Sequence, residues 1–204
     1  MTLKPSRTQL INLYTKGLEF LKQGLYNKAL RCFNEIIKAI PERSHSYITR
    51  GFTYYKLNNL LCALSDYDQA LKLDPKSKDA LLNRANLYFK IKDYENSKRD
   101  YNMALKLDPN DVRGNVGIGL IKARDGDYEG AIAEFNTAIK AGNKHALYLR
   151  CFAYSHNGEF TNSTNDIVSI SNSGVSIDAD DSRKLFQLYK DNIRKSTLYL
   201  VPKI

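Results

Sequence analysis

The sequence predicts an all-α fold in which antiparallel helix pairs stack in a row, an α-solenoid. The first observation is an internal echo, because DYDQALKLDP at 66–75 returns as DYNMALKLDP at 100–109 with eight of ten residues identical at an offset of 34 residues. A fixed period of about 20 to 50 residues is typical of repeat architectures. The second is that small and large residues alternate at helical spacing, and the third is a proline at the end of each of the first three periods.

Extending the echo in both directions gives five registers. They begin at Leu10, Ser44, Lys78, Val112 and Lys144. The eighth and twentieth positions hold small residues and the eleventh and twenty-fourth mostly aromatic ones, so two helices can approach closely while the large side chains fill the space between them. The thirty-second position holds Pro41, Pro75 and Pro109, which end the second helix. A glycine or a polar pair near the fifteenth position, such as Gly24, predicts the turn between the helices.

Composition and charge fit a folded chain without a basic stripe along its middle. Hydrophobic residues make up 43% and charged residues 26% of the chain, which is enough apolar surface for a core. The net charge of +9 lies at the ends, because residues 1–43 hold eight Lys and Arg against three Asp and Glu, and residues 178–204 hold six against four. We therefore do not expect nucleic acid as the main partner, and contact of the basic N-terminal end with RNA or another polyanion is an alternative.

The N-terminus and the cysteines favour a reducing compartment. The opening MTLKPSRTQLINLY lacks the apolar core of a secretory signal, and no apolar run approaches the roughly 18 residues of a membrane helix. We therefore expect a cytoplasmic protein that does not contact a membrane, with the nucleus as the alternative. Cys32, Cys62 and Cys151 form no close pair, which predicts buried, reduced thiols and neither a disulfide nor a zinc site.

The pattern of the registers resembles the tetratricopeptide repeat, whose 34-residue unit carries a large residue, Leu-Gly, an aromatic residue, Ala, Phe and Pro at these spacings. The resemblance covers residues 10–177 and implies a right-handed superhelix of five repeats. The repeats span 10–43, 44–77, 78–111, 112–143 and 144–177. Residues 1–9 form an N-terminal extension, and residues 178–204 are expected to form a cap helix and a tail.

The C-terminal part predicts a weak last repeat helix followed by a cap. The segment TNSTNDIVSISNSG is rich in Asn, Ser and Thr, which lower helix propensity, so we expect this helix to fray first. The next segment, RKLFQLYKDNIRK, carries an apolar stripe and predicts the helix that covers the solenoid end. The closing TLYLVPKI is expected to pack along the cap helix, and presentation to a partner is the alternative.

No catalytic motif accompanies the repeats. The sequence has no H-E-x-x-H pair, no G-x-x-x-x-G-K-[ST] loop and no G-x-S-x-G elbow, so we expect a non-enzymatic protein without cofactor or metal. Gly114, Gly117 and Gly119 lie close together, and three glycines weaken a helix interior by about 2 to 3 kcal/mol. Either this helix is merely weak, or Gly117 is a bare patch where the backbone of a partner approaches.

The resemblance implies that the first helix of each repeat lines a concave groove with positions two, five, six, nine, twelve and thirteen. Here the groove is apolar and aromatic, with cations at position thirteen that we name the cationic rail: Lys22, Lys56, Lys90 and Arg124. A cation is common at this position, so the rail is either ordinary surface solvation or a feature that recognises an acidic ligand. The candidate groove residues are Tyr14, Lys22, Thr49, Phe52, Lys56, Asn83, Asn86, Phe89, Lys90, Arg113, Gly117 and Arg124.

Some grooves of this family bind the acidic C-terminal tails of heat-shock chaperones through Lys, Asn and Arg at defined positions of three consecutive repeats. From the second repeat onward, these positions hold Ile48, Phe52, Asn83, Arg113 and Gly117. Only Asn83 is kept, and Arg113 is a partial substitute. We therefore predict a protein interaction scaffold or adaptor that binds an acidic or apolar peptide segment of a partner protein, with a co-chaperone-type adaptor as the alternative.

Overall fold

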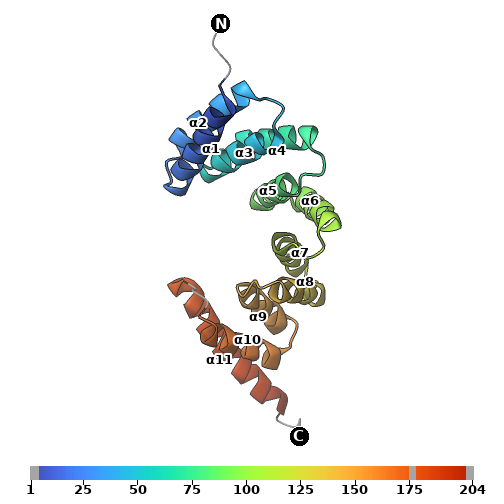
Figure 1. Ribbon diagram of the computed structural model, residues 1–204. Helices are drawn as coiled ribbons and strands as arrows, with labels where there is room; N and C mark the ends of the chain where they lie inside the picture. The colour runs from blue at the N-terminus through green and yellow to red at the C-terminus, as the bar shows by residue number, and fades with distance from the viewer. Residues whose placement is uncertain (1–4, 175–177, 201–204) are drawn as a thin grey trace. The chain divides into compact units, whose positions relative to one another are not determined.

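The computed structural model describes residues 5–174 and 178–200, which form eleven α-helices and no strand (Figure 1). The helices are α1 (Arg7–Lys22), α2 (Tyr26–Ala39), α3 (Ser44–Lys56), α4 (Leu60–Leu73), α5 (Lys78–Lys90), α6 (Tyr94–Leu107), α7 (Val112–Arg124), α8 (Tyr128–Lys140), α9 (Ala146–His156), α10 (Phe160–Asn172) and α11 (Ala179–Leu200). The predicted all-α solenoid class is confirmed.

The helices form successive pairs that gather into two compact units. The first unit ends at Leu107 and contains α1 to α6, and the second begins at Asp108 and contains α7 to α11. Within the first unit α3 also contacts α5, and within the second α9 contacts α7 and α11, so the first helices of successive pairs lie next to one another. The residue boundaries of the five repeats stay a prediction.

The turn inside each pair has the same backbone geometry five times. The fifteenth residue of each register has a positive φ, between 59° and 85°: Gly24, Asn58, Lys92, Gly126 and Gly158. The N–H of the next residue donates to the carbonyl oxygen five residues earlier, as from Asn59 to Tyr54 and from Asp93 to Tyr88, both at 2.9 Å. This closure is the Schellman motif, and it confirms the predicted position of the turn.

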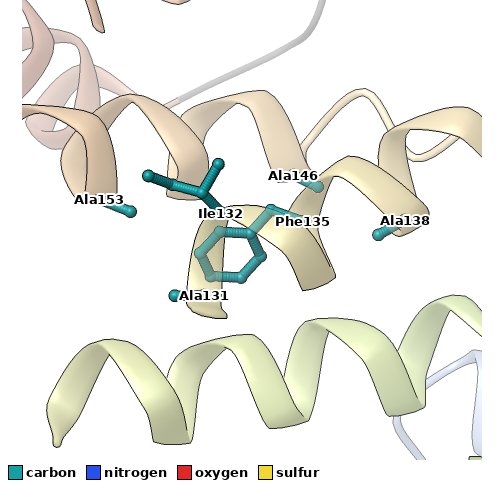
Figure 2. Close-up of a cluster of buried hydrophobic side chains, with 6 residues drawn as sticks. All are labelled: Ala131, Ile132, Phe135, Ala138, Ala146 and Ala153. Carbon is teal, nitrogen blue, oxygen red and sulfur yellow. The ribbon is translucent and has the colours of Figure 1, made fainter. Parts of the chain in front are cut away.

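Small residues on one helix and an aromatic ring on the other build the core of a pair. Figure 2 shows the cluster formed by Ala131, Ile132, Phe135, Ala138, Ala146 and Ala153. Phe135 is 1% exposed, and a Cβ built on Gly119 of α7 would lie 2.5 Å from its Cε1. In this pair, glycine at the eighth position therefore lets the Phe135 ring pass close to the helix backbone.

A buried ion pair that we did not predict recurs in three repeats. The pairs join positions seven and twenty-three and are Arg50–Asp66, Arg84–Asp100 and Arg150–Asp166, with nitrogen–oxygen distances of 2.6, 2.6 and 2.5 Å. Each arginine also donates to a side chain on the preceding second helix, for example from Arg84 Nη1 to Asp68 Oδ1 at 2.7 Å. We name this arrangement the arginine clamp. The constant separation of 16 residues between arginine and aspartate is the sequence signal that predicts it.

A buried amide holds α11 against the last helix pair. Asn192 is fully buried, and its Nδ2 donates to Ser163 Oγ at 2.8 Å while its Oδ1 accepts from Ser155 Oγ at 2.9 Å. Ser163 Oγ donates in turn to the carbonyl oxygen of Cys151 at 2.6 Å. A buried polar group of this kind is stable only when its hydrogen bonds are satisfied, as they are here.

Two details of the sequence prediction change, and a third stays open. Cys62 is exposed, although Cys32 and Cys151 are buried as expected, because Cys62 lies beside the buried stripe of α4 and not on it. Residues 197–200 continue α11 instead of packing along it, and residues 201–204 of TLYLVPKI lie outside the described residues. The polar segment of the fifth repeat is helical as α10, with Ile167 and Ile170 buried, and its early fraying stays a prediction.

Candidate functional site

A cleft in the first unit brings several candidate groove residues together. It has a volume of about 340 Å³, and we name it the amide cleft; it is lined by Phe52, Tyr55, Tyr67, Asn83, Asn86, Phe89 and Lys90. Five of these seven belong to the predicted groove set. Tyr55 of α3 and Tyr67 of α4 are the additional rings, and Tyr67 was assigned from the sequence to packing alone. Helical spacing places the predicted residues of α3 and α5 on facing surfaces of neighbouring helices.

Hydrogen bonds within the protein orient one amide of the cleft. The Tyr101 hydroxyl donates to Asn86 Oδ1 at 2.6 Å, which turns the Nδ2 donor of Asn86 toward other partners. Burial raises the pKa of Tyr101 well above its usual value, so the hydroxyl remains a donor at neutral pH. The side chain of Asn86 is itself exposed. A ligand therefore meets an amide whose orientation is already fixed.

Two cations of the rail lie beside aromatic rings of the amide cleft. Lys90 Nζ donates to Asn58 Oδ1 at 2.9 Å and lies 4.7 Å from the centroid of the Tyr55 ring. Lys56 Nζ lies 5.2 Å from the centroid of the Phe52 ring. Both contacts favour the charged amine near the ring face, so the cleft combines an apolar floor with a positive rim.

The other candidate residues of the first unit lie outside the amide cleft. The Tyr14 hydroxyl is 2.7 Å from His45 Nε2 and 3.4 Å from Thr49 Oγ1, which links α1 to α3. Thr49 is buried, and its hydroxyl donates to the His45 carbonyl oxygen at 3.0 Å, so it presents no open surface to a ligand. Lys22 is exposed in the last turn of α1.

The second unit has a cleft of its own, which we name the aromatic cleft. It has a volume of about 370 Å³ and is lined by Leu120, Ala123, Arg124, Tyr128, Phe135, Tyr148, Leu149, Phe152, Ala153, His156 and Lys184. The rings of Tyr128 and His156 stack with centroids 5.2 Å apart and planes 12° apart. Only Arg124 comes from the candidate set. Lys184 belongs to α11, which the repeat positions do not describe.

The remaining candidates of the second unit do not line the aromatic cleft. Arg113 is exposed near the start of α7, with Nη2 3.6 Å from Asp111 Oδ2. Gly117 is buried within α7, which runs without a break through Gly114 and Gly119. The bare patch at Gly117 stays a prediction, and the burial of Gly117 within α7 argues against it.

Both clefts offer hydroxyls, cations and aromatic rings, and the amide cleft adds two side-chain amides; such groups bind ligands by contact and hydrogen bonding. In residues 5–174 and 178–200, no group of three or more His, Cys, Asp or Glu is arranged to hold a metal ion. No helix in this described part of the chain has the length and apolar character needed to cross a membrane.

Paired helices that repeat one turn and one core define the chain as a helical-repeat solenoid. Two family models match it, one described as "Tetratricopeptide repeat" at residues 79–111 and one described as "TPR repeat" at residues 51–92. The chain is a tetratricopeptide repeat protein, and this repeat family typically acts as a non-enzymatic interaction module. No curated protein matches the chain.

Solved structures share the fold. PilW, described as a widely conserved type IV pilus biogenesis factor, has a TM-score of 0.79 and 18% identity, covering 96% of this chain and 91% of that chain. A tetratricopeptide repeat protein from Parabacteroides merdae ATCC 43184 has a TM-score of 0.72 and 21% identity, covering 92% and 75%. The first TPR of Spaghetti (RPAP3), solved bound to the HSP90 peptide SRMEEVD, has a TM-score of 0.56 and 25% identity, covering 61% and 98%.

Proposed function

We propose that this protein is a non-enzymatic scaffold whose amide cleft binds an extended peptide segment of a partner protein. The observation that carries the proposal is the fixed amide of Asn86, held by Tyr101, beside Asn83 and above the aromatic floor. Side-chain amides carry a donor and an acceptor and therefore match the peptide backbone. A site of this kind binds the peptide backbone through hydrogen bonds. It selects the peptide sequence through the side chain that enters the cleft.

The lining of the amide cleft also suggests what the peptide carries. An apolar or aromatic side chain would rest on Phe52 and Phe89, because both are half-buried rings that line the floor. An acidic side chain would lie near Lys90 and Lys56 at the positive rim, where a charge-assisted hydrogen bond can form. The exposed candidate Lys22, which belongs to the same unit, would contribute to longer-range attraction of the same acidic segment.

Replacing Asn86 by alanine should weaken peptide binding about tenfold, because the peptide loses an oriented hydrogen-bond partner worth about 1.4 kcal/mol. The measurement is fluorescence anisotropy with peptides selected from a phage library displaying random twelve-residue sequences on the immobilised protein. Asn102→Ala, an exposed asparagine on α6 outside the cleft, is the matched control and should bind as wild type does. Unchanged affinity in both Asn86→Ala and Phe89→Ala would place the binding site elsewhere.

A co-chaperone-type adaptor is the second candidate, and one observation favours it: the RPAP3 repeat domain, 25% identical over 61% of this chain, was solved with the HSP90 peptide SRMEEVD. Against it stands the loss of all but one of the clamp residues in the register that keeps Asn83. We expect isothermal titration with SRMEEVD to show no saturable binding. Micromolar affinity that is lost in Arg113→Ala but kept in Asn86→Ala would favour the adaptor over binding in the amide cleft.

A further inference from the structure

The arginine clamp joins the first helix of one pair to the second helix of the preceding pair. In α5 the guanidinium of Arg84 lies 5.9 Å from the centroid of the Tyr88 ring, at positions seven and eleven of the repeat. Its nitrogens reach Asp100 of its own pair at 2.6 Å and Asp68 of the preceding second helix at 2.7 Å. The same preceding-helix position supplies an acceptor from Asn34 to Arg50 at 2.8 Å. A complete junction thus contains a cation over a ring and an acceptor from the incoming helix.

The first helix pair has the cation and the ring without either acceptor. Lys16 and Phe20 occupy positions seven and eleven, with Nζ 5.8 Å from the ring centroid, and Lys28 Nζ lies 5.6 Å from the same centroid. Position twenty-three holds Cys32 where three other repeats hold aspartate. Burial raises the pKa of Cys32, so this position carries a neutral thiol that cannot balance the charge of Lys16. In the described residues no helix covers the corresponding face of α1.

The first pair also has a clear excess of positive charge. Its six cations are Arg7, Lys16, Lys22, Lys28, Arg31 and Lys38, against the two acids Glu19 and Glu35. Within residues 5–174 and 178–200, none of these six cations takes part in a salt bridge, whereas the position-seven arginines of three later pairs all do. A face of this charge attracts an anionic partner and repels a basic one.

The geometry favours an acidic helix over a phosphate chain. Base stacking by single-stranded nucleic acid needs an open aromatic face. Phe20 packs against the core cluster of Phe33, and two ammonium groups already lie over its ring. Lys16 and Phe20 instead occupy the repeat positions that elsewhere in this chain contact the second helix of the preceding pair. A carboxylate on a docked helix would contact Lys16 as Asp68 contacts Arg84.

We propose that the face of α1 and α2 formed by Lys16, Phe20 and Lys28 docks an acidic helix of a partner protein, which continues the stack of helices. This surface is separate from the amide cleft, so the inference goes beyond the proposed peptide binding. The docked helix would supply the carboxylate that the first pair lacks. The contact would be electrostatic in large part and would weaken as salt increases.

The test uses a helix whose sequence comes from this chain. The probe is a synthetic peptide of residues 60–73, the sequence of α4, which carries Lys72→Glu and is stapled on its exposed side to hold it helical. It presents Asp68 as α4 presents this residue to Arg84 of α5. We expect saturable binding by fluorescence anisotropy to the full chain, weakened about tenfold when Lys16→Gln removes one charge-assisted contact of about 1.4 kcal/mol. Lys16→Arg should retain binding, and so should Lys98→Gln, an exposed lysine of α6, and Asn86→Ala.

Matched probes distinguish the occupants. The same stapled peptide with Asp66→Asn and Asp68→Asn should bind at least several times more weakly than the acidic one. Poly(U) and vesicles containing phosphatidylserine are tested at the same salt concentration. Binding of either that is lost in Lys16→Gln, without binding of the acidic helix, would overturn the proposal and make this face a nucleic-acid or membrane contact. Failure of the acidic helix to bind wild type would overturn it as well, independently of any result for the amide cleft.

Discussion

Replacing Arg84 by alanine should lower the free energy of unfolding by about 3 to 5 kcal/mol, because it leaves a buried carboxylate without its partner. The Asp100 side chain is 0% exposed and accepts from Arg84 Nε at 2.6 Å and from Nη2 at 3.0 Å. Burial alone would lower the pKa of Arg84, but hydrogen bonds to Asp100 and Asp68 raise it above its usual value, so the guanidinium stays charged. Such a loss is a large part of the roughly 5 to 15 kcal/mol that stabilises a domain.

Urea denaturation followed by circular dichroism measures this effect. Arg99→Ala is the matched control, since Arg99 Nε lies 3.5 Å from the same Asp100 carboxylate but its side chain is 56% exposed, and it should cost less than about 1 kcal/mol. Replacing both partners, Arg84→Met with Asp100→Leu, should recover much of the stability because no buried charge remains. Equal shifts for Arg84→Ala and Arg99→Ala would show that the clamp is not a stabilising contact of the buried kind.

The helix ends could be predicted from the sequence because they depend on neighbours along the chain. Proline stands two residues after the last residue of α2, α4 and α6, where it can no longer interrupt the helix interior. The turns need one residue of positive φ, which glycine adopts at low cost and which Asn58 adopts at 59°. Lys92 adopts 65°, which shows that the repeated Schellman closure imposes this conformation even on a residue that disfavours it.

Burial of single side chains could not be predicted in the same way. Thr49 occupies a groove position, but it is buried and contacts Tyr14 from another helix pair. Tyr67 reaches the amide cleft from a second helix, although the groove positions lie on first helices. The arginine clamp combines residues 16 apart with a side chain from the preceding pair, and Ile118 shows that its cation is not kept in the fourth repeat. These outcomes depend on contacts between pairs, which a single repeat pattern does not contain.

Candidate residues were placed together correctly where their position depends on one helix face only. Phe52 lies on α3, and Asn83, Asn86 and Phe89 share one side of α5, so helical spacing was sufficient to place them at one cleft. The orientation of Asn86 required the Tyr101 hydroxyl of α6. The direction of an amide is therefore a tertiary property, even when its position on the helix is a local one.

Truncating Phe135 to alanine should destabilise the second unit by about 3 to 5 kcal/mol, since the ring is 1% exposed and its removal leaves a cavity. The buried members of its cluster include four alanines, which have no side-chain length with which to fill the space (Figure 2). We therefore expect a cost near the upper end of the range, measured by urea denaturation. Phe186→Ala is the control in the same unit, because its ring is 59% exposed and its loss should cost less than about 1 kcal/mol.

The effect of Gly119→Ala on stability should depend on whether the Phe135 ring is present. Alanine normally stabilises a helix interior by about 1 kcal/mol relative to glycine, but here the added Cβ would lie 2.5 Å from Phe135 Cε1. Gly119→Ala alone should therefore destabilise the protein, whereas in the Phe135→Ala background the methyl group occupies part of the cavity and gains the helix propensity. The sign of the same substitution should reverse between the two backgrounds, as expected for two residues in contact. If the two effects simply add, the ring of Phe135 does not require glycine at this position.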